Sequence, residues 1–454
     1  MIFITELNWG IFEVISLLTI CIAGFFTTII IIPYVIGLMK RKGYIGNDIH
    51  KNSKPEVPES GGLSIVIGIS LTSLLLMIFF HNLYNELLIY FLTILISGLI
   101  GFIDDRIKLK SFYKIVLTIL TGTAIFLANY IGFISIKSPT LPFLGVTRLT
   151  MIYPLAAPLI VAVFANASNM LEGYNGEGSG TSLIALFFLF ICGLIWNSSI
   201  VILITSTSIA VIIAFFIYNK FPAKIFPGDI GTLSIGSIFA CIALLGSMEV
   251  AVFCALLIHI FNSFFVISSV RGFFESSEIQ DQKSDIILLD NDIIIASEKR
   301  TSALTLPRLI LAKGPLKEPD LVKNFYVISI ICGFFSIISI LLTQWTLGNL
   351  NFFYVYLFIF IFLIPTTILL YYYPRIRGII SLMIILLIVI ILLLILIDSV
   401  IMKIFYEEID LIFIRIPTNI LFSLILIAPI LIIWYFLTIK YFWSQIKKLK
   451  KLNT

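Results

Sequence analysis

The stretch FLTILISGLIGFIDDR, Phe91–Arg106, is an apolar run that ends in two adjacent carboxylates and an arginine. A helix of about 20 apolar residues crosses the roughly 30 Å of hydrocarbon in a bilayer. Runs of this kind recur along nearly the whole chain of 454 residues, which is 60% hydrophobic and 12% charged, with a mean hydropathy of +1.11. Soluble domains carry far more charge. The sequence therefore predicts an all-α fold, a polytopic membrane helical bundle without a soluble domain of ordinary size.

The apolar runs predict about thirteen spanning helices. They lie near residues 11–39, 62–80, 86–103, 115–131, 151–165, 180–196, 199–218, 232–247, 249–270, 324–345, 350–371, 378–402 and 418–439. The first run is too long for the core of a signal peptide, and no small-residue cleavage site follows it, so we expect a retained spanning helix. The five cysteines lie inside apolar runs and are expected to be packing residues rather than disulfide partners.

Lysines and arginines collect in alternate loops, among them Lys40–Lys54, Arg106–Lys114 and the tail from Lys440 to Lys451. The positive-inside rule predicts that these loops face the cytosol and that the N-terminus is external, in a multi-pass protein of the cell membrane. The one sizeable extramembrane segment, about 272–323, is charged and has prolines in its second half. We expect it to fold over the cytosolic face.

Four polar stretches interrupt the hydrophobic pattern, and this topology places all of them at the cytosolic surface. They are GNDIHKNSKPEVPESGG (46–62), DDRIKLKSFYK (104–114), NASNMLEGYNGEGSG (166–180) and NKFPAKIFPGDIGTLSIG (219–236). Each has an ordinary interpretation by itself: a flexible basic loop, membrane-flanking charge, a hydrogen-bond network in the bundle, and an aspartate that caps a helix. Their coincidence on one face indicates a functional site.

The oxygen ligands in these stretches favour a particular chemistry. Asp104, Asp105, Asp229 and Asn169 offer hard oxygen atoms, and lysines and glycine-exposed backbone amides lie close to them in the sequence. Such groups suit Mg²⁺ that carries a phosphorylated ligand. The chain's three histidines are scattered and no His/Cys constellation argues for zinc.

The third stretch begins with amides at helical spacing. Asn166 and Asn169, three residues apart, share one face of a helix, and Glu172 continues that face. The glycines that follow allow a ligand to approach the backbone closely. Polar groups at the end of a membrane span are costly unless they are satisfied, so they form either a bundle network or a binding site.

At these residues the sequence resembles the polyprenyl-phosphate N-acetylhexosamine-1-phosphate transferases of glycosyltransferase family 4, integral membrane enzymes that move a sugar 1-phosphate from a UDP-sugar to a lipid phosphate. The resemblance covers about residues 10–345. It rests on GFIDD followed by Lys114, on Asn166-x-x-Asn169, on Asn175-Gly176 and on PAKIFPGDIGTLSIG (222–236). It implies a core of about ten helices over 1–346, with its cytosolic loop at 272–323. Beyond this core the apolar runs predict an extension of about three more transmembrane helices over 347–454.

Within that family, two motifs look more like the eukaryotic and archaeal branch, which makes dolichyl-linked N-acetylglucosamine, than like the bacterial peptidoglycan branch. These are VPE at Val57–Glu59 and the Asn175-Gly176 pair. The isoleucine-rich composition and LTLPRLILAKGPL (304–316) also look archaeal.

The resemblance implies roles for the acids and the lysine. Asp229 and Asn169 would coordinate Mg²⁺, or Mn²⁺ in its place, on the pyrophosphate of the UDP-sugar. Lys114 would contact phosphate charge. Asp104 and Asp105 would organise the lysine and metal region, one of them deprotonating or positioning the lipid phosphate.

The resemblance also implies the substrate-binding residues. Asn175 and Phe226 would bind uracil through an amide hydrogen bond and ring stacking, and Glu59 and Lys54 would belong to the nucleotide-side loop. The remaining candidates are Asn166, Glu172, Arg300 and Arg308. The two arginines are the substitutes for the Arg–His or His clusters that other branches carry in the long loop and that this chain lacks.

The implied activity is transfer of N-acetylglucosamine 1-phosphate from UDP-N-acetylglucosamine to a polyprenyl or dolichyl phosphate, with UMP released at the cytosolic face, as the first step of N-glycan-type assembly. The implied partners are the UDP-sugar, the lipid phosphate and membrane lipid, with no nucleic acid and a homodimer as a possible assembly. The same chemistry with UDP-N-acetylgalactosamine or a UDP-muramoyl-peptide donor is the first alternative. A secondary transporter is the second, disfavoured because the polar residues cluster on one side without a repeat.

Overall fold

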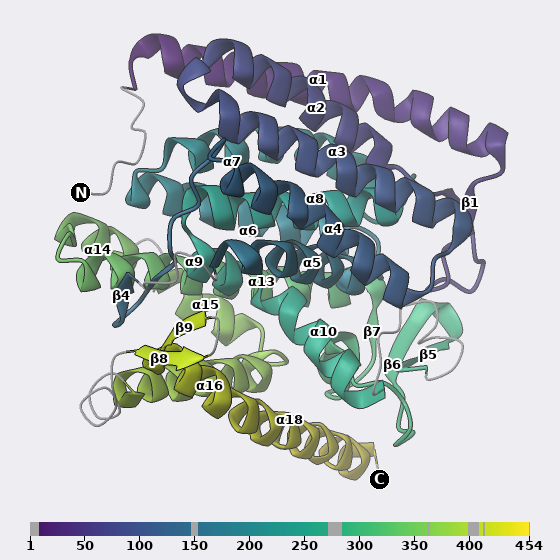
Figure 1. The fold of residues 1–454 in the computed structure, drawn as a ribbon. Coiled ribbons are helices and arrows are strands. Elements are labelled where there is room, and N and C mark those ends of the chain that lie inside the picture. Colours follow the sequence, from purple (N-terminus) through teal and green to yellow (C-terminus); the bar gives the residue numbers. More distant parts are fainter. Residues whose placement is uncertain are drawn as a thin grey trace.

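The computed structural model describes residues 9–146, 153–270, 284–360, 364–397, 408–411 and 414–453. In these residues, ten helices are long and apolar enough to cross a membrane, and a bent helix pair makes an eleventh crossing if it counts as one span. Most of them lie side by side in a bundle, as Figure 1 shows. The predicted polytopic helical membrane protein is confirmed.

The long helices follow the predicted apolar runs. Those of the core are α1 (Ile11–Lys42), α2 (Gly62–Phe79), α3 (Tyr84–Ile107), α4 (Ser111–Tyr130), α5 (Tyr153–Leu171), α6 (Glu177–Trp196), α7 (Ser199–Asn219), α8 (Gly228–Gly246) and α13 (Glu318–Thr346). The predicted span 249–270 is α9 (Glu249–Ala255) and α10 (Leu257–Val270), which meet at 71°. This crossing is therefore broken rather than straight.

The C-terminal region departs from the expected three straight spans. The predicted span 350–371 is present as two short helices, α14 (Phe352–Phe358) and α15 (Ile364–Tyr372). The other two are α16 (Arg377–Leu396) and α18 (Thr418–Asn453), of which α18 has the length and apolarity of a span. The end of the predicted span 378–402 lies outside the described residues.

Short strands and turns lie between the helices. The antiparallel pairs are β1 (Ile45–Asn47) with β2 (Glu56–Pro58), β3 (Thr140–Leu141) with β4 (Gly145–Val146), and β8 (Glu408–Leu411) with β9 (Ile414–Pro417). The predicted loop 272–323 contains a three-stranded sheet, β5 (Ile286–Leu289), β6 (Ile293–Ala296) and β7 (Leu316–Lys317), and the short helix α12 (Leu306–Leu311). Its residues before 284 lie outside the described chain. The loop is thus a small folded unit at the end of the bundle.

Helix α8 is the most enclosed span, with 83% of its apolar window buried. Glycines bring neighbouring backbones against its first turn. A Cβ atom on Gly62 of α2 would lie 2.1 Å from the Gly231 nitrogen, and one on Gly101 of α3 would lie 2.4 Å from the Asp229 carbonyl oxygen. Small residues at such contacts are how membrane helices approach closely. The first turn of α8 is therefore fixed between α2 and α3.

Replacing Gly101 by alanine is expected to destabilise the bundle. The new methyl group meets backbone rather than a flexible side chain, so α3 and α8 must separate, at about 1–3 kcal/mol for an overpacked core. The measurement is the thermal unfolding midpoint of the detergent-solubilised protein. Gly37→Ala in α1 is the matched control, because nothing lies within 4 Å of a Cβ atom there. Equal midpoints for the two variants would contradict the contact.

The C-terminal helices share an apolar cluster with the core. Trp434 of α18 stacks on Phe265 of α10 at 5.0 Å between ring centroids, and its indole N–H donates to the Leu382 carbonyl of α16 at 3.0 Å. The same cluster contains residues of α12 and α13. The boundary near residue 347 between a core and an extension stays a prediction, since the packing is continuous across it.

Polar contacts also join the C-terminal helices to the folded loop. Lys313 donates to the Pro374 carbonyl at 2.9 Å, and Arg375 donates to the Gly314 carbonyl at 2.9 Å. At the end of α18, Lys450 pairs with Glu298 of the loop at 2.5 Å. The loop is therefore held between the bundle and the C-terminal helices.

Candidate active site

The four polar stretches meet at one end of the bundle, around the buried ammonium group of Lys114. Its Nζ atom lies 2.5 Å from Asp104 Oδ2 and 2.8 Å from Asp229 Oδ2. Lys114 enters from the first turn of α4, Asp104 from the last turn of α3, and Asp229 from the first turn of α8. One lysine thus joins three helix ends and two carboxylates.

Asn169 completes this group from the last turn of α5. With its amide oriented to satisfy its neighbours, the nitrogen donates to Asp229 Oδ1 at 2.9 Å and to Thr232 Oγ1 at 2.8 Å, and the oxygen accepts from Lys114 Nζ at 3.3 Å. Asp229, Asn169, Asp104 and Lys114 therefore form one contiguous hydrogen-bonded centre.

The two adjacent acids of GFIDDR serve different neighbours. Asp104 accepts from the Leu109 backbone N–H at 2.8 Å as well as pairing with Lys114. Asp105 accepts from the Asp229 backbone N–H at 2.7 Å and from Ser60 Oγ at 2.6 Å. A carboxylate that accepts a free N–H at the start of a helix stabilises that end. Asp105 therefore holds the first turn of α8, and with it Asp229, against the loop that follows β2.

The centre differs in accessibility from one side chain to the next. Asp104 and Lys114 are 2% and 3% exposed, whereas Asp229 is 20% exposed. Carboxylate and amide oxygens are the atoms that Mg²⁺ prefers in proteins, and they gather here beside a cation that can contact phosphate. The residues present therefore fit a magnesium ion, with Asp229 as the carboxylate that an incoming ion and its ligand can reach.

The predicted uracil-binding residues lie on two separate segments. Asn175 is buried at the start of the turn before α6, where its backbone N–H donates to Glu318 Oε1 at 2.7 Å and its side chain to Asp48 Oδ2 at 2.9 Å. Phe226 is half-buried, and its backbone bonds both Pro58 and Gly61 of the first polar stretch. Both are thus positioned by contacts with segments distant in the sequence.

The other two candidates of the first stretch differ in placement. Glu59 is half-buried and packs over Gly46, where a Cβ atom would lie 2.1 Å from its Oε1. Lys54 is exposed, in the turn between β1 and β2, with a φ of +43°. Glu59 therefore packs against the first strand of the hairpin, and Lys54 lies in the turn that connects its two strands.

Asn166 and Glu172 fall at the two ends of the predicted amide face. Asn166 donates to Thr118 Oγ1 at 2.9 Å and so ties α5 to α4. Glu172 follows α5, and its carboxyl group accepts from the Gly178 backbone N–H in the first turn of α6. Burial raises the pKa of Glu172 to about 8 in spite of this hydrogen bond. Glu172 is therefore largely protonated at neutral pH.

The raised pKa of Glu172 predicts a pH dependence of stability. Between about pH 4.5, its ordinary value, and about pH 8, the folded chain holds a proton at this group that the unfolded chain releases. The contribution of Glu172 to the free energy of unfolding therefore decreases as the pH rises from about 4.5 to about 8. We expect the thermal midpoint of the wild-type protein to fall from pH 5.5 to pH 8 more steeply than that of Glu172→Gln.

The matched control for that series is Glu56→Gln, at an exposed position in β2. It should leave the pH profile of the midpoint unchanged. Parallel profiles for the wild type and Glu172→Gln would show that Glu172 ionises normally.

The two candidate arginines of the long loop lie in different surroundings. Arg308 is 3% exposed, and its guanidinium group donates to the backbone carbonyls of Ser297, Lys299, Ser302 and Ala303. Burial lowers the pKa of Arg308 to about 10. Arg300 is exposed near the sheet. Arg308 thus fastens the loop from within, and Arg300 is the one that solvent reaches.

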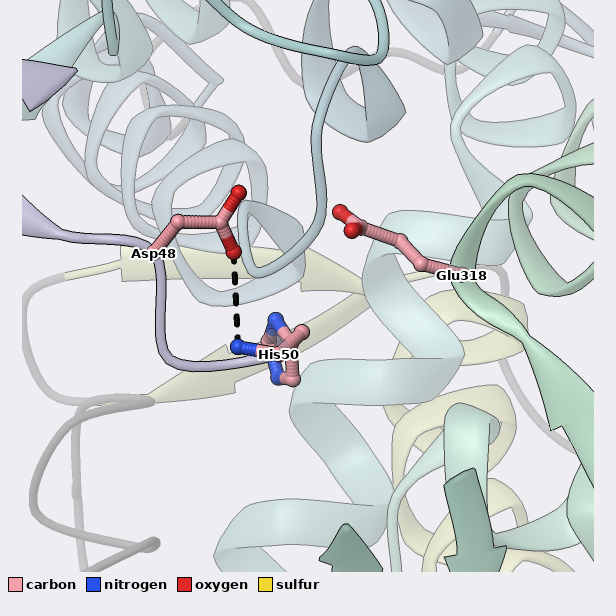
Figure 2. A group of neighbouring side chains, drawn as sticks. All are labelled: Asp48, His50 and Glu318. Carbon is pink, nitrogen blue, oxygen red and sulfur yellow. Dashed lines mark hydrogen bonds between the residues drawn. The ribbon is translucent and has the colours of Figure 1, made fainter. Parts of the chain in front are cut away.

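A cluster that the sequence did not single out lies beside Asn175. Asp48, His50 and Glu318 each offer one ligating atom, and these atoms lie within 4.8 Å of one another. Figure 2 shows the Glu318 carboxylate directed toward Asp48, with His50 below them. Burial lowers the pKa of His50 to about 4, so its ring is neutral at physiological pH. Asp48 and His50 stand in the first polar stretch, but Glu318 carries no sequence signal, since it simply begins α13.

Comparison with known proteins relates the chain to a family of transferases. Residues 87–247 match the sequence profile described as glycosyl transferase family 4. The chain is 35% identical over 251 residues to a Sulfolobus acidocaldarius protein provisionally named UDP-N-acetylglucosamine–dolichyl-phosphate N-acetylglucosaminephosphotransferase, covering 53% of this chain and 74% of that relative.

Two further relatives extend the comparison. A provisionally named glycosyltransferase of Methanocaldococcus jannaschii is 29% identical over 329 residues, covering 72% of this chain and 97% of that protein. A phospho-N-acetylmuramoyl-pentapeptide-transferase of Latilactobacillus sakei is 28% identical over 269 residues, covering 56% of this chain and 84% of its own length.

Proposed function

Because this chain belongs to glycosyl transferase family 4, we propose that it transfers N-acetylglucosamine 1-phosphate from UDP-N-acetylglucosamine to a polyprenyl or dolichyl phosphate. The single observation that carries the proposal is the Lys114 ammonium group between Asp104 and Asp229, next to Asn169. Phosphoryl transfer between two anions requires charge neutralisation and alignment more than covalent help from the protein. The ammonium group, the carboxylates and the amide at one end of the helix bundle can supply both charge neutralisation and alignment.

In the proposed reaction, an oxygen of the lipid phosphate attacks the β-phosphorus of the UDP-sugar directly. The new P–O bond forms as the bond to UMP breaks, which leaves a lipid diphosphate-linked sugar and UMP. Asp229 and Asn169 would hold a divalent cation, which would supply charge neutralisation at the pyrophosphate. Lys114 contacts phosphate oxygens as negative charge shifts toward the leaving UMP.

The two acids of GFIDDR have separate roles in this proposal. Asp104 holds Lys114 in place, and we propose that this pair meets the incoming lipid phosphate. Asp105 positions Asp229 through its backbone N–H. Asp104→Asn and Asp105→Asn should therefore lower turnover more than donor affinity.

The donor side is proposed to bind the nucleotide. Asn175 and Phe226 contact uracil, and Glu59 and Lys54 belong to the nucleotide-side loop. Asn166 ties α5 to α4, and Glu172 holds the α5–α6 connection. The exposed side chain of Arg300 is the loop cation available to the sugar pyrophosphate. Arg308 supports it by holding the loop backbone.

The site is proposed to face the cytosol of the cell membrane, because the basic loops lie at this end. Two exposed lysines lie in these loops: Lys54 between β1 and β2, and Lys110 between α3 and α4. Cysteines introduced at these two positions should resist an impermeant thiol reagent added to intact cells. Ready labelling from outside would invert the topology.

The test of the activity is a product assay on membranes that contain the protein. Radiolabelled UDP-N-acetylglucosamine should yield a lipid product with the mass of the polyprenyl diphosphate-linked sugar, together with UMP. UDP-N-acetylgalactosamine and a UDP-muramoyl peptide are supplied in parallel. A product from only one of these other donors would overturn the choice of sugar, and no product from any donor would overturn the function.

A further inference from the structure

We propose that Asp48, His50 and Glu318 bind a divalent transition-metal cation of the zinc or manganese type, at a site separate from Asp229 and Asn169. The three ligating atoms lie within 4.8 Å of one another, so a single ion can contact all of them after small side-chain movements. Asp48 and His50 belong to the turn between β1 and β2, and Glu318 begins α13. The ion would join the first polar stretch to the end of the folded loop.

The first argument is that a buried carboxylate oxygen of Glu318 has no hydrogen-bond partner. Glu318 is 3% exposed, and its Oε1 accepts the Asn175 N–H, but its Oε2 has no hydrogen-bond partner. A buried carboxylate oxygen without a partner is costly, since it has lost water and gained no donor. Figure 2 shows this carboxylate aimed into the cluster. A cation there would satisfy it.

The second argument is the balance of charge. Two buried carboxylates, Asp48 at 3% exposure and Glu318, face each other across the cluster. Lys51 pairs with Asp48 and also lies over the Phe221 ring at 4.6 Å. In the described residues the two carboxylates therefore share the positive charge of Lys51, which leaves one negative charge uncompensated. A divalent ion, or a proton on Glu318, would compensate it.

The third argument is the kind of ligand. One imidazole nitrogen with two carboxylate oxygens suits zinc, manganese or ferrous iron better than magnesium, which prefers oxygen atoms alone. The His50 ring stacks on Tyr174 at 4.1 Å between centroids, and this contact fixes its orientation. A cavity of about 40 Å³ lined by His50, Gly173 and Tyr174 adjoins the cluster and has room for water on the metal.

The site would act on the donor side through Asn175. The Asn175 side chain donates to Asp48 and its backbone N–H donates to Glu318, so an ion between these acids fixes both hydrogen-bond acceptors. This consequence rests on the proposed function, in which Asn175 contacts uracil. Filling the site should lower the KM for the UDP-sugar and change kcat little.

The binding test does not depend on activity. The full-length protein, purified in detergent and stripped with a chelator, is dialysed against micromolar Zn²⁺ with millimolar Mg²⁺, and its metal content is measured by mass spectrometry. A parallel dialysis uses Mn²⁺, detected by electron paramagnetic resonance. We expect about one ion per chain in the wild type. Glu318→Gln and His50→Gln should each weaken binding by at least about tenfold.

The variants are chosen to keep the fold intact. Glu318→Gln retains a carbonyl oxygen for the Asn175 N–H and removes the negative charge. His81→Gln is the matched control, because His81 is exposed in the turn before α3 and should leave binding unchanged. Gel filtration and the thermal midpoint are measured for each variant. A variant that keeps its midpoint but loses the metal supports the site.

Three results would overturn the proposal. The first is a wild-type chain that takes up neither metal, which would assign the compensating charge to a proton on Glu318. The second is equal metal content in the wild type and both ligand variants. The third is metal that Asp229→Ala loses and Glu318→Gln retains, which would place it at the other centre. A wild type that binds zinc but transfers no sugar would refute the proposed function and leave the metal site standing.

Discussion

Asp229→Ala is expected to reduce metal-dependent release of UMP by about a thousandfold or more, since a lost metal ligand costs several kcal/mol of transition-state stabilisation. Asp229 is the most accessible acid of the Lys114 centre. Its side chain also contacts Lys114 and Asn169, so alanine removes the group at which the three meet. The loss should appear in kcat and should not be recovered by saturating donor.

The fold of the Asp229→Ala variant should survive. The first turn of α8 is anchored through the Asp229 backbone N–H, which donates to Asp105, and alanine keeps that N–H. The glycine contacts of α8 with α2 and α3 are also unchanged. Asp320→Ala is the matched control, because Asp320 also lies in the first turn of a helix but is 55% exposed. Wild-type turnover in Asp229→Ala would remove this residue from the chemistry.

Lys114→Met is expected to lower both turnover and stability. The ammonium group is 3% exposed and lies within 2.8 Å of both Asp104 and Asp229, so methionine leaves the buried Asp104 and the partly exposed Asp229 without their cation. Breaking a buried ion pair by removing one partner costs about 3–5 kcal/mol. Turnover should fall by about a hundredfold or more, because the phosphate loses its positive contact as well.

A double variant separates these two effects of Lys114. Asp104→Asn added to Lys114→Met removes one of the stranded charges, and it should raise the thermal midpoint above that of the single variant. It should not restore turnover. Lys110→Met, at an exposed position just before α4, is the matched control for lost positive charge. Recovery of turnover in the double variant would mean that Lys114 has only a structural role.

The sequence predicted the bundle because each span carries its own signal. The length of each apolar run is enough to identify α1 to α8 and α13, because it does not depend on which helices pack beside them. The bend between α9 and α10 could not be predicted in this way, since the run 249–270 contains no proline or glycine to mark the break at Leu256. The paired short helices α14 and α15 were missed although Pro365, at the start of α15, lies inside the predicted span.

The polar stretches could be grouped from the sequence, but their contacts could not. Topology predicts that Asp104, Lys114 and Asp229 lie at one end of the bundle. The hydrogen bond from the Asp229 backbone N–H to Asp105 depends on how closely α3 and α8 pack, which the topology does not specify. Glu318 lies 143 residues from the amide that it binds and begins an ordinary apolar helix. No pattern within the sequence could pair the two.

Arg308 shows a different limit. Its position in a charged, proline-bearing loop favours a ligand-binding arginine, and the sequence cannot reveal that four carbonyl groups of the same loop surround it. A buried guanidinium group with backbone partners organises its own segment. The roles of both loop arginines in substrate recognition stay predictions.

The pairing of Lys450 with Glu298 provides two positions at which the distance between α18 and the folded loop can be measured by spectroscopy. Both side chains are more than half exposed, at 60% and 51%, so labels at these positions should perturb the packing little. A pair of nitroxide spin labels there would report the separation of α18 from the loop by pulsed dipolar spectroscopy. Recorded with and without nucleotide in lipid nanodiscs, the distance distribution would reveal whether the loop shifts during the catalytic cycle.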